Sequence, residues 1–209
     1  MSDGLSLLVV DVSEAFEEML KATEREYLVD WDGISPGAYK EKELYRDPIF
    51  ERMHYPYGSL RSGLNAIVDT TRIARERGIP VYAVHYYTGN SDGEEQTCLS
   101  LQPYISEKNR YEKHVPSAFG CQLANRLEAD DCRHLMVIGY DRDDCVMATV
   151  KDAVARGITV VTSEHCMLTQ NLRDRRASSL VYFQENTVFL GKLVDVWNYI
   201  RSATVPSSF

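Results

Sequence analysis

The chain has 209 residues, of which 44% are hydrophobic and 26% charged, a composition typical of a globular protein with one domain. Its formal net charge of −8 argues against a nucleic-acid partner, because proteins that bind phosphate backbones present a basic face. No apolar run approaches the roughly 20 residues that a membrane helix needs, so we expect no membrane partner either.

Short apolar runs alternate along the chain with amphipathic stretches. Leu5–Val12 is nearly continuous in apolar residues, which is typical of a strand buried on both faces of a parallel sheet. Residues 59–77 carry an apolar stripe at helical spacing, and Gly78 and Pro80 end this predicted helix. The other predicted elements, in chain order, are the strand Ile79–Tyr86, a helix near Cys121–Ala129, the strand His134–Tyr140, a helix from about Asp144 to Arg156, the strand Ile158–Ser163, a helix near Leu168–Gln184, the strand Thr187–Leu190 and a helix near Leu193–Ser202.

This alternation predicts an α/β fold formed by one domain over residues 1–209. We expect a three-layer, doubly wound, Rossmann-like structure, with a mostly parallel sheet of about six strands and helices on both faces. Such folds place ligands at the carboxyl ends of the strands. Asp11 and the segment Gly139–Cys145 each lie at the end of a predicted strand, so they are the first candidates for function.

Residues 27–57 interrupt the alternation. The segment is longer than most connections in compact domains and is rich in aromatic residues, including Trp31. It is predicted to be an insertion or flap, acting either as a lid over a pocket or as an interface with another subunit.

The N-terminus and the cysteines favour a cytoplasmic protein. Met1–Gly4 has no basic region, and the apolar stretch that follows ends at Asp11, so we expect no signal peptide. The 5 cysteines are odd in number and show no C-x-x-C spacing, which disfavours a disulfide framework or a zinc ribbon.

Cys145 is the strongest candidate nucleophile. It follows the strand His134–Tyr140 after a short polar turn and opens a predicted helix. A helix N-terminus favours a thiolate, and its free N–H groups can bind an oxyanion. The alternative is a buried structural cysteine, and position alone does not separate the two.

Asp11 and Lys113 are weaker candidates when each is considered alone. A carboxylate at the end of a buried strand needs a partner, but taken by itself Asp11 is better interpreted as the cap of a helix that begins near Glu14. Lys113, in the segment Tyr111–Phe119, would alone be interpreted as a surface lysine.

Three motifs in the same order give these residues a common interpretation. G-Y-D-R-D-D-C-V-M-A-T at Gly139–Thr149 resembles the nucleophile segment of the isochorismatase-like hydrolases. K-x-x-x-S-A-F at Lys113–Phe119 is similar to the catalytic-lysine segment of that superfamily. L-L-V-V-D-V, with Phe16 five residues after Asp11, is similar to its opening strand. The superfamily includes nicotinamidases, N-carbamoylsarcosine amidase and ureidoacrylate-type amidohydrolases.

The resemblance implies a cysteine hydrolase that cleaves a C–N bond of a small amide or carbamoyl substrate through a thioester. Cys145 would be the nucleophile, Asp11 the general acid and base, and Lys113 the supporting cation. It also implies a cis peptide at Tyr140–Asp141, which aims the N–H groups of Asp141 and Cys145 into an oxyanion hole. The expected substrate-binding residues are Phe16, His85, Tyr87, Phe119 and Arg142.

The turn before Cys145 departs from the usual pattern because it carries three acids. We expect Asp143 to cap the following helix and the Asp141 side chain to point to solvent. Arg142 is interpreted as either a group that grips a substrate carboxylate or a solvated side chain.

Several alternatives stay open. The histidines show no metal-binding spacing, so we expect no metal and no cofactor. Glu164-His165-Cys166 could form a cysteine–histidine dyad, but side chains of adjacent residues rarely point at one another. Vinyl-ether hydrolysis, as on isochorismate, and a non-catalytic binding or scaffold role are the alternative functions. The expected partners are a small-molecule substrate and further copies of the chain, in a dimer or tetramer.

Overall fold

A parallel sheet forms the centre of the molecule. The computed structural model describes residues 4–14, 57–87, 97–169 and 178–203. Within them, a seven-stranded sheet runs in the order β3-β2-β1-β4-β5-β7, with β6 paired to β4, and every pairing is parallel. The strands are β1 (Leu5–Val10), β2 (Val81–Tyr86), β3 (Arg110–Lys113), β4 (His134–Tyr140), β5 (Thr159–Thr162), β6 (Met167–Leu168) and β7 (Val188–Phe189).

The two central strands, β1 and β4, lie side by side with Leu5 opposite His134 and Val10 opposite Gly139. All six residues of β1 are buried, as the apolar run predicted for a strand covered on both faces. At Gly139, φ is +132°, and a Cβ atom there would lie 2.1 Å from the carbonyl oxygen of Val10. Glycine is therefore needed where these two strands approach each other at their carboxyl ends.

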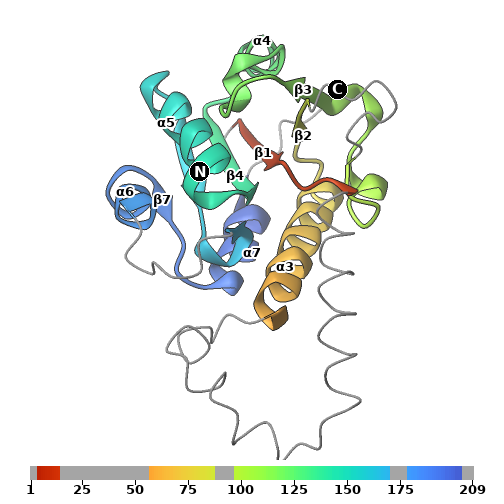
Figure 1. Cartoon of the computed structure of the whole chain (residues 1–209), viewed down its shortest axis with the longest axis vertical. Coiled ribbons are helices and arrows are strands. Elements are labelled where there is room, and N and C mark those ends of the chain that lie inside the picture. Colours follow the sequence, from red (N-terminus) through yellow and green to blue (C-terminus); the bar gives the residue numbers. More distant parts are fainter. Residues whose placement is uncertain (1–3, 15–56, 88–96, 170–177, 204–209) are drawn as a thin grey trace, which may run out of the picture.

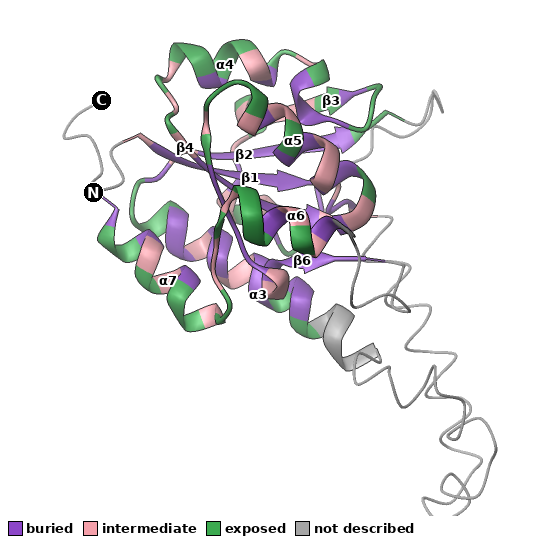
Figure 2. Ribbon diagram, turned by 90° about the vertical axis from the view of Figure 1, so that its left-hand side faces the viewer, coloured by how far each residue is buried: buried purple, intermediate pink, exposed green. Residues whose placement is uncertain are grey.

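Helices cover both faces of the sheet (Figures 1 and 2). On one face, α3 (Tyr57–Glu76) and α7 (Leu193–Ser202) pack against each other and on a core that includes Leu7 and Val9. A second core, on the face of Leu8 and Val10, is closed by the remaining helices. These are α4 (Leu123–Ala129), α5 (Met147–Ala155) and α6 (Ser178–Asn186).

The predicted α/β class and its largely parallel sheet are confirmed, but several element boundaries differ. The helix expected from Asp144 begins earlier, as a π-helical turn at Arg142–Val146, and α5 itself starts at Met147. Leu168, where the helix to Gln184 was expected to begin, instead ends strand β6, and the described part of α6 is Ser178–Asn186. Strand β3 was not predicted because its sequence, Arg-Tyr-Glu-Lys, has no apolar run.

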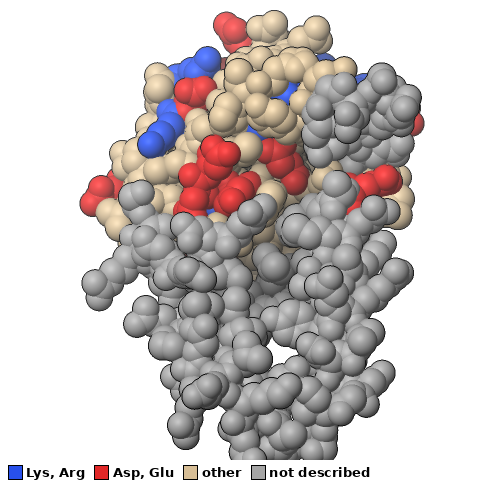
Figure 3. Space-filling model, in the orientation of Figure 1, with Lys and Arg blue, Asp and Glu red and all other residues tan. Residues whose placement is uncertain are grey.

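Two further predictions concern regions or properties beyond the sheet. The insertion predicted at residues 27–57 lies outside the described residues, except that Tyr57 begins α3. No helix in the described ranges is long and apolar enough to cross a membrane. On the face drawn in Figure 3, acidic side chains gather in the middle of the described surface, in keeping with the formal net charge of −8.

Candidate active site

The three predicted catalytic residues lie at or just after the ends of three strands of the sheet. Asp11 follows β1, Lys113 ends β3, and Cys145 lies in the turn after β4. Because the sheet is parallel in the order β3-β2-β1-β4, the carboxyl ends of these strands meet at one edge of the sheet. The side chains meet there: Lys113 Nζ lies 2.8 Å from Asp11 Oδ2, and the Cys145 thiol interacts with both.

Lys113 is a fully buried cation, with 0% of its side chain exposed. Besides pairing with Asp11, its ammonium group donates a hydrogen bond to the carbonyl oxygen of Pro116 at 2.5 Å. It also lies 5.4 Å from the ring centroid of Tyr86, within the range of a cation–π contact. A buried charge is tolerated only with such partners, so Lys113 is not the surface lysine that its local sequence suggests.

Asp11 is tied through its backbone to the neighbouring strand β2. Its backbone has φ of 50°, in the left-handed region, and its N–H donates a hydrogen bond to the carbonyl of Val84 at 2.9 Å. Burial raises the pKa of Asp11 above its usual value, and contacts with Lys113, Cys145 and the backbone of Tyr86 only partly oppose this. A carboxylate with a raised pKa is a better acceptor for a proton from a neighbouring group.

The surroundings of Cys145 favour the protonated thiol. Burial, and then the hydrogen bond and negative charge of Asp11, raise the pKa of Cys145 to about 12, although Lys113 opposes the shift. Burial and Asp11 therefore oppose the thiolate that a helix N-terminus favours. Deprotonation requires a base, and the adjacent base is Asp11.

The turn that carries Cys145 has the expected cis peptide at Tyr140–Asp141. The carbonyl of Asp141 accepts hydrogen bonds from the N–H groups of Asp144, at 3.2 Å, and of Val146, at 3.0 Å. The two donors are the residues on either side of Cys145, and neither hydrogen bond involves the N–H of Cys145 itself. The Asp141 side chain caps the turn by accepting a hydrogen bond from the N–H of Asp143, so it does not simply point to solvent, and Asp143 is not the cap.

Arg142 is buried and paired. Only 9% of the residue is exposed, and its Nε and Nη2 atoms donate to the two carboxylate oxygens of Asp143 at 3.0 and 2.9 Å. The interpretation of Arg142 as a solvated side chain is therefore wrong. Its role in substrate binding stays a prediction.

The other predicted substrate-binding residues differ in burial and in their contacts. His85 is buried, and its Nε2 lies 2.8 Å from Thr97 Oγ1. Tyr87 is exposed and packs edge-on against His114, with 4.9 Å between ring centroids. Phe119 is buried beneath the guanidinium of Arg156, and Phe16 lies outside the described residues.

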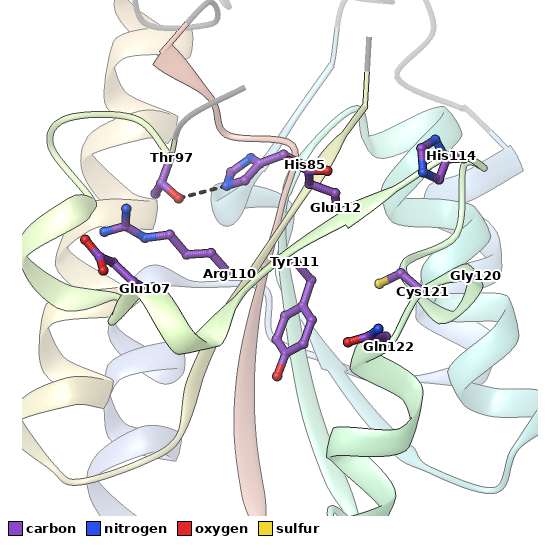
Figure 4. Close-up of a pocket in the computed structure, with 10 residues that line it drawn as sticks. All are labelled: His85, Thr97, Glu107, Arg110, Tyr111, Glu112, His114, Gly120, Cys121 and Gln122. Atoms are coloured by element: carbon purple, nitrogen blue, oxygen red, sulfur yellow. Dashed lines mark hydrogen bonds between the residues drawn. The ribbon is translucent and has the colours of Figure 1, made fainter. Parts of the chain in front are cut away.

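An open pocket of about 830 Å³ lies along the edge strand β3 (Figure 4). His85 and Thr97 lie on one side of the strand, and Cys121 and Gln122 lie on the other. Of the described residues that line this pocket, none is a predicted catalytic residue. The lining residues are His85, Thr97, Glu107, Arg110, Tyr111, Glu112, His114, Gly120, Cys121 and Gln122.

Two residues in contact with Lys113 were missed by sequence reasoning, Tyr86 and Pro116. Tyr86 stands opposite Lys113 in the β2–β3 register, so knowledge of strand β3 would have identified it. Pro116 contributes a backbone oxygen, which no side-chain motif reveals.

The alternative sites are not assembled in the described part of the chain. His165 Nε2 lies 3.2 Å from the carbonyl oxygen of Gly191, while the buried Cys166 contacts Thr70, so these neighbours do not form a dyad. No group of three or more His, Cys, Asp or Glu residues that could hold a metal ion occurs within the described ranges.

Comparison with known proteins shows which proteins share this family and fold. A family model described as Isochorismatase domain matches residues 59–190, whereas no match is found among curated proteins. The solved structure of an isochorismatase from Pseudomonas putida KT2440 is 18% identical, with a TM-score of 0.62 over 92% of this chain and 89% of that one.

Two amidases have similar structures. N-carbamoylsarcosine amidase from Thermoplasma acidophilum is 17% identical, with a TM-score of 0.55 over 87% of this chain and 91% of that one. The nicotinamidase SaPncA from Staphylococcus aureus is 15% identical, with a TM-score of 0.59 over 90% of this chain and 99% of that one. At these identities the likeness concerns the fold.

Proposed function

Because the chain belongs to the isochorismatase family of hydrolases, we propose that it is a cysteine hydrolase that cleaves a C–N bond of a small amide or carbamoyl substrate. The observation that supports this proposal most directly is the contact of the Cys145 thiol with the Asp11–Lys113 ion pair. A nucleophile beside a base that is itself oriented by a third group is the usual arrangement of covalent catalysis.

The first half of the proposed reaction forms a thioester. As the Cys145 sulfur attacks the carbonyl carbon of the substrate, its proton passes to Asp11. The electron pair of the C=O bond moves to oxygen, and the resulting oxyanion accepts hydrogen bonds from the backbone N–H groups of Asp141 and Cys145. When the C–N bond breaks, the proton on Asp11 moves to the departing amine.

The second half hydrolyses the thioester. Asp11, again a carboxylate, takes a proton from a water molecule as the water oxygen attacks the same carbonyl carbon. Collapse of the second tetrahedral intermediate breaks the C–S bond, and the proton returns to sulfur. Lys113 stays charged throughout and keeps the Asp11 carboxylate oriented through the 2.8 Å ion pair.

The alternative functions have less support. Vinyl-ether hydrolysis does not need a thiol, and a scaffold role needs neither the buried lysine nor its carboxylate. The names of the structural relatives include both chemistries, an isochorismatase beside an amidase and a nicotinamidase, so the preference rests on the thiol and its ion pair.

The test is a panel of small amides, ureas and carbamoyl amino acids assayed for ammonia release. We expect turnover of at least one compound by the wild-type protein, no turnover by Cys145→Ala, and a thioester on Cys145 detectable by mass spectrometry after rapid acid quench. Cys132→Ala, a matched change at a half-buried thiol, should keep full activity. Undiminished ammonia release by Cys145→Ala would exclude Cys145 as the nucleophile.

A further inference from the structure

The carboxylate of Asp143 lies at the centre of a dense hydrogen-bond network. Besides the two bonds from Arg142, it accepts one from Thr169 Oγ1 at 2.9 Å and a short one from Ser179 Oγ. Thr169 and Ser179 are 6% and 3% exposed, so water does not replace these bonds readily. No reacting group of the proposed mechanism belongs to this network.

The network keeps Asp143 ionised. Burial alone would raise the pKa of Asp143, but hydrogen bonds from Arg142, Ser179 and Thr169, together with the charge of Arg142, outweigh it and lower the pKa. Charge-assisted hydrogen bonds of this kind are roughly twice as strong as neutral ones. The carboxylate is therefore a strong acceptor at any pH at which the protein would work.

The two partners outside the turn come from elements that flank the site. Thr169 directly follows β6, whose residues Met167 and Leu168 pair with Gly139 and Tyr140 at the end of β4. The Asp143–Thr169 bond thus continues the β4–β6 pairing beyond the last strand residues. Ser179 lies in the first turn of α6, so the same carboxylate ties the turn to a helix as well.

Asp143 precedes Cys145 by two residues within the five-residue turn Arg142–Val146. We propose that Asp143 is a positioning residue, whose carboxylate fixes this turn to β6 and α6 and so holds the sulfur of Cys145 against Asp11 and Lys113. The inference rests on the proposed function only in taking Cys145 as the nucleophile.

Asp143→Asn tests the proposal because it preserves the shape of the side chain while removing its charge and one acceptor oxygen. An amide cannot accept all four hydrogen bonds, so the turn should loosen. We expect kcat for ammonia release to fall by about 10- to 100-fold with KM changed less than about 2-fold, because misplacement of a reacting group by about 1 Å can cost 100-fold.

Alkylation of Cys145 by iodoacetamide, followed by mass spectrometry from pH 7 to 10, gives a second readout. In the wild-type protein, burial and Asp11 raise the pKa of this thiol to about 12, so alkylation should be slow. In Asp143→Asn the sulfur should leave that environment, and alkylation at pH 8 should become at least about 5-fold faster, since the thiolate is the reactive form. A change that speeds alkylation while slowing hydrolysis indicates misplacement of the nucleophile.

Matched controls separate positioning from charge and from unfolding. Asp144→Asn removes the same charge from an exposed residue next to Cys145 and should change neither rate. Cys98 and Cys166 are fully buried and should stay unlabelled as long as the fold is intact. If Cys98 and Cys166 are alkylated in Asp143→Asn, that variant has lost its fold and Ser179→Ala replaces it as the test. Ser179→Ala removes only the hydrogen bond from α6 to Asp143, so it should also speed alkylation of Cys145 and slow ammonia release.

Two outcomes would overturn the proposal. The first is wild-type kcat and wild-type alkylation of Cys145 in both Asp143→Asn and Ser179→Ala. The second is an equal effect of Asp144→Asn, which would mean that charge alone matters. If no amide is turned over even by the wild-type protein, the proposed function fails, but the alkylation rates still confirm or refute the role of Asp143.

Discussion

At the scale of single residues, the site is defined by two acids whose protonation is linked. Burial raises the pKa of both Asp11 and Cys145, and the two side chains are hydrogen-bonded to each other. The proton that Cys145 must lose therefore has a short path to a carboxylate made more basic by burial. The positive charge of Lys113 opposes this effect, because it lowers the pKa of both Asp11 and Cys145.

Asp11→Asn should separate thiol reactivity from hydrolysis. Without the base, turnover should fall by about 100- to 10,000-fold, the usual contribution of a general acid or base. Yet the thiol should become more acidic, because the hydrogen bond and charge of Asp11 are among the causes that raise the pKa of Cys145 to about 12. Iodoacetamide should therefore alkylate Cys145 faster in Asp11→Asn than in the wild-type protein at pH 8 to 9.

Lys113→Met is a control in which the pKa of Cys145 should change in the opposite direction. Lys113 lowers the pKa of Cys145, so its removal should slow alkylation as well as hydrolysis. Equal or slower alkylation in Asp11→Asn would contradict the proton link between Asp11 and Cys145.

At the scale of elements, the site depends on how closely β1 and β4 approach each other. Gly139→Ala would place Cβ 2.1 Å from the oxygen and 2.7 Å from the nitrogen of Val10, at a φ of +132°. We expect the free energy of unfolding to fall by at least about 2 kcal/mol, from backbone strain and forced separation of the strands. Activity should fall too, because Asp11 follows Val10 and the Cys145 turn follows Gly139.

Urea denaturation of three glycine variants checks this prediction. Gly191→Ala should leave the free energy of unfolding nearly unchanged, because no atom of the described residues, apart from its chain neighbours, lies within 4 Å of the added carbon. Gly157→Ala also meets no atom but has φ of +77°, so it should cost about 1–2 kcal/mol from backbone strain alone. A Gly139→Ala protein as stable as Gly191→Ala would show that the strands tolerate the extra carbon.

The elements also show where sequence patterns succeed. The strand His134–Tyr140 and the helix Leu193–Ser202 have the predicted boundaries, because continuous apolar runs and amphipathic periodicity are local signals. Strands β3 and β6 were missed, since one is a polar edge strand and the other has only 2 residues. Their existence depends on pairing with β2 and β4, which no local pattern encodes.

At the scale of the whole molecule, the order β3-β2-β1-β4 brings together residues that are far apart in the chain. The resemblance in three motifs was enough to name Asp11, Lys113 and Cys145, but not to show that Lys113 is buried or that Asp143 binds Thr169 and Ser179. Those contacts depend on the register of segments joined only by the sheet. The fold class follows from local alternation, whereas the site requires the topology.

The pH dependence of global stability follows from another buried group, His85. Burial, aided by the charges of Arg110 and Lys113, lowers the pKa of His85 to about 4, and its Nδ1 atom is buried without a hydrogen-bond partner among the described residues. Protonation would leave a charged ring with an unpaired donor in the interior, so the folded protein resists it.

The sign of the effect follows from proton binding in the two states. Between about pH 6.5 and pH 4 the unfolded chain holds a proton on His85 and the folded protein does not, so the free energy of unfolding should fall as the pH is lowered through this window. The contribution of His85 should be on the order of 2 kcal/mol. Urea denaturation at several pH values from 7.5 to 4.5 measures this contribution. It is the difference between the wild-type protein and His85→Gln in how steeply the free energy of unfolding falls as the pH is lowered. His114→Gln, a control at an exposed histidine, should show the wild-type dependence of the free energy of unfolding on pH. If His85→Gln also shows the wild-type dependence, His85 does not contribute to it and the prediction is wrong.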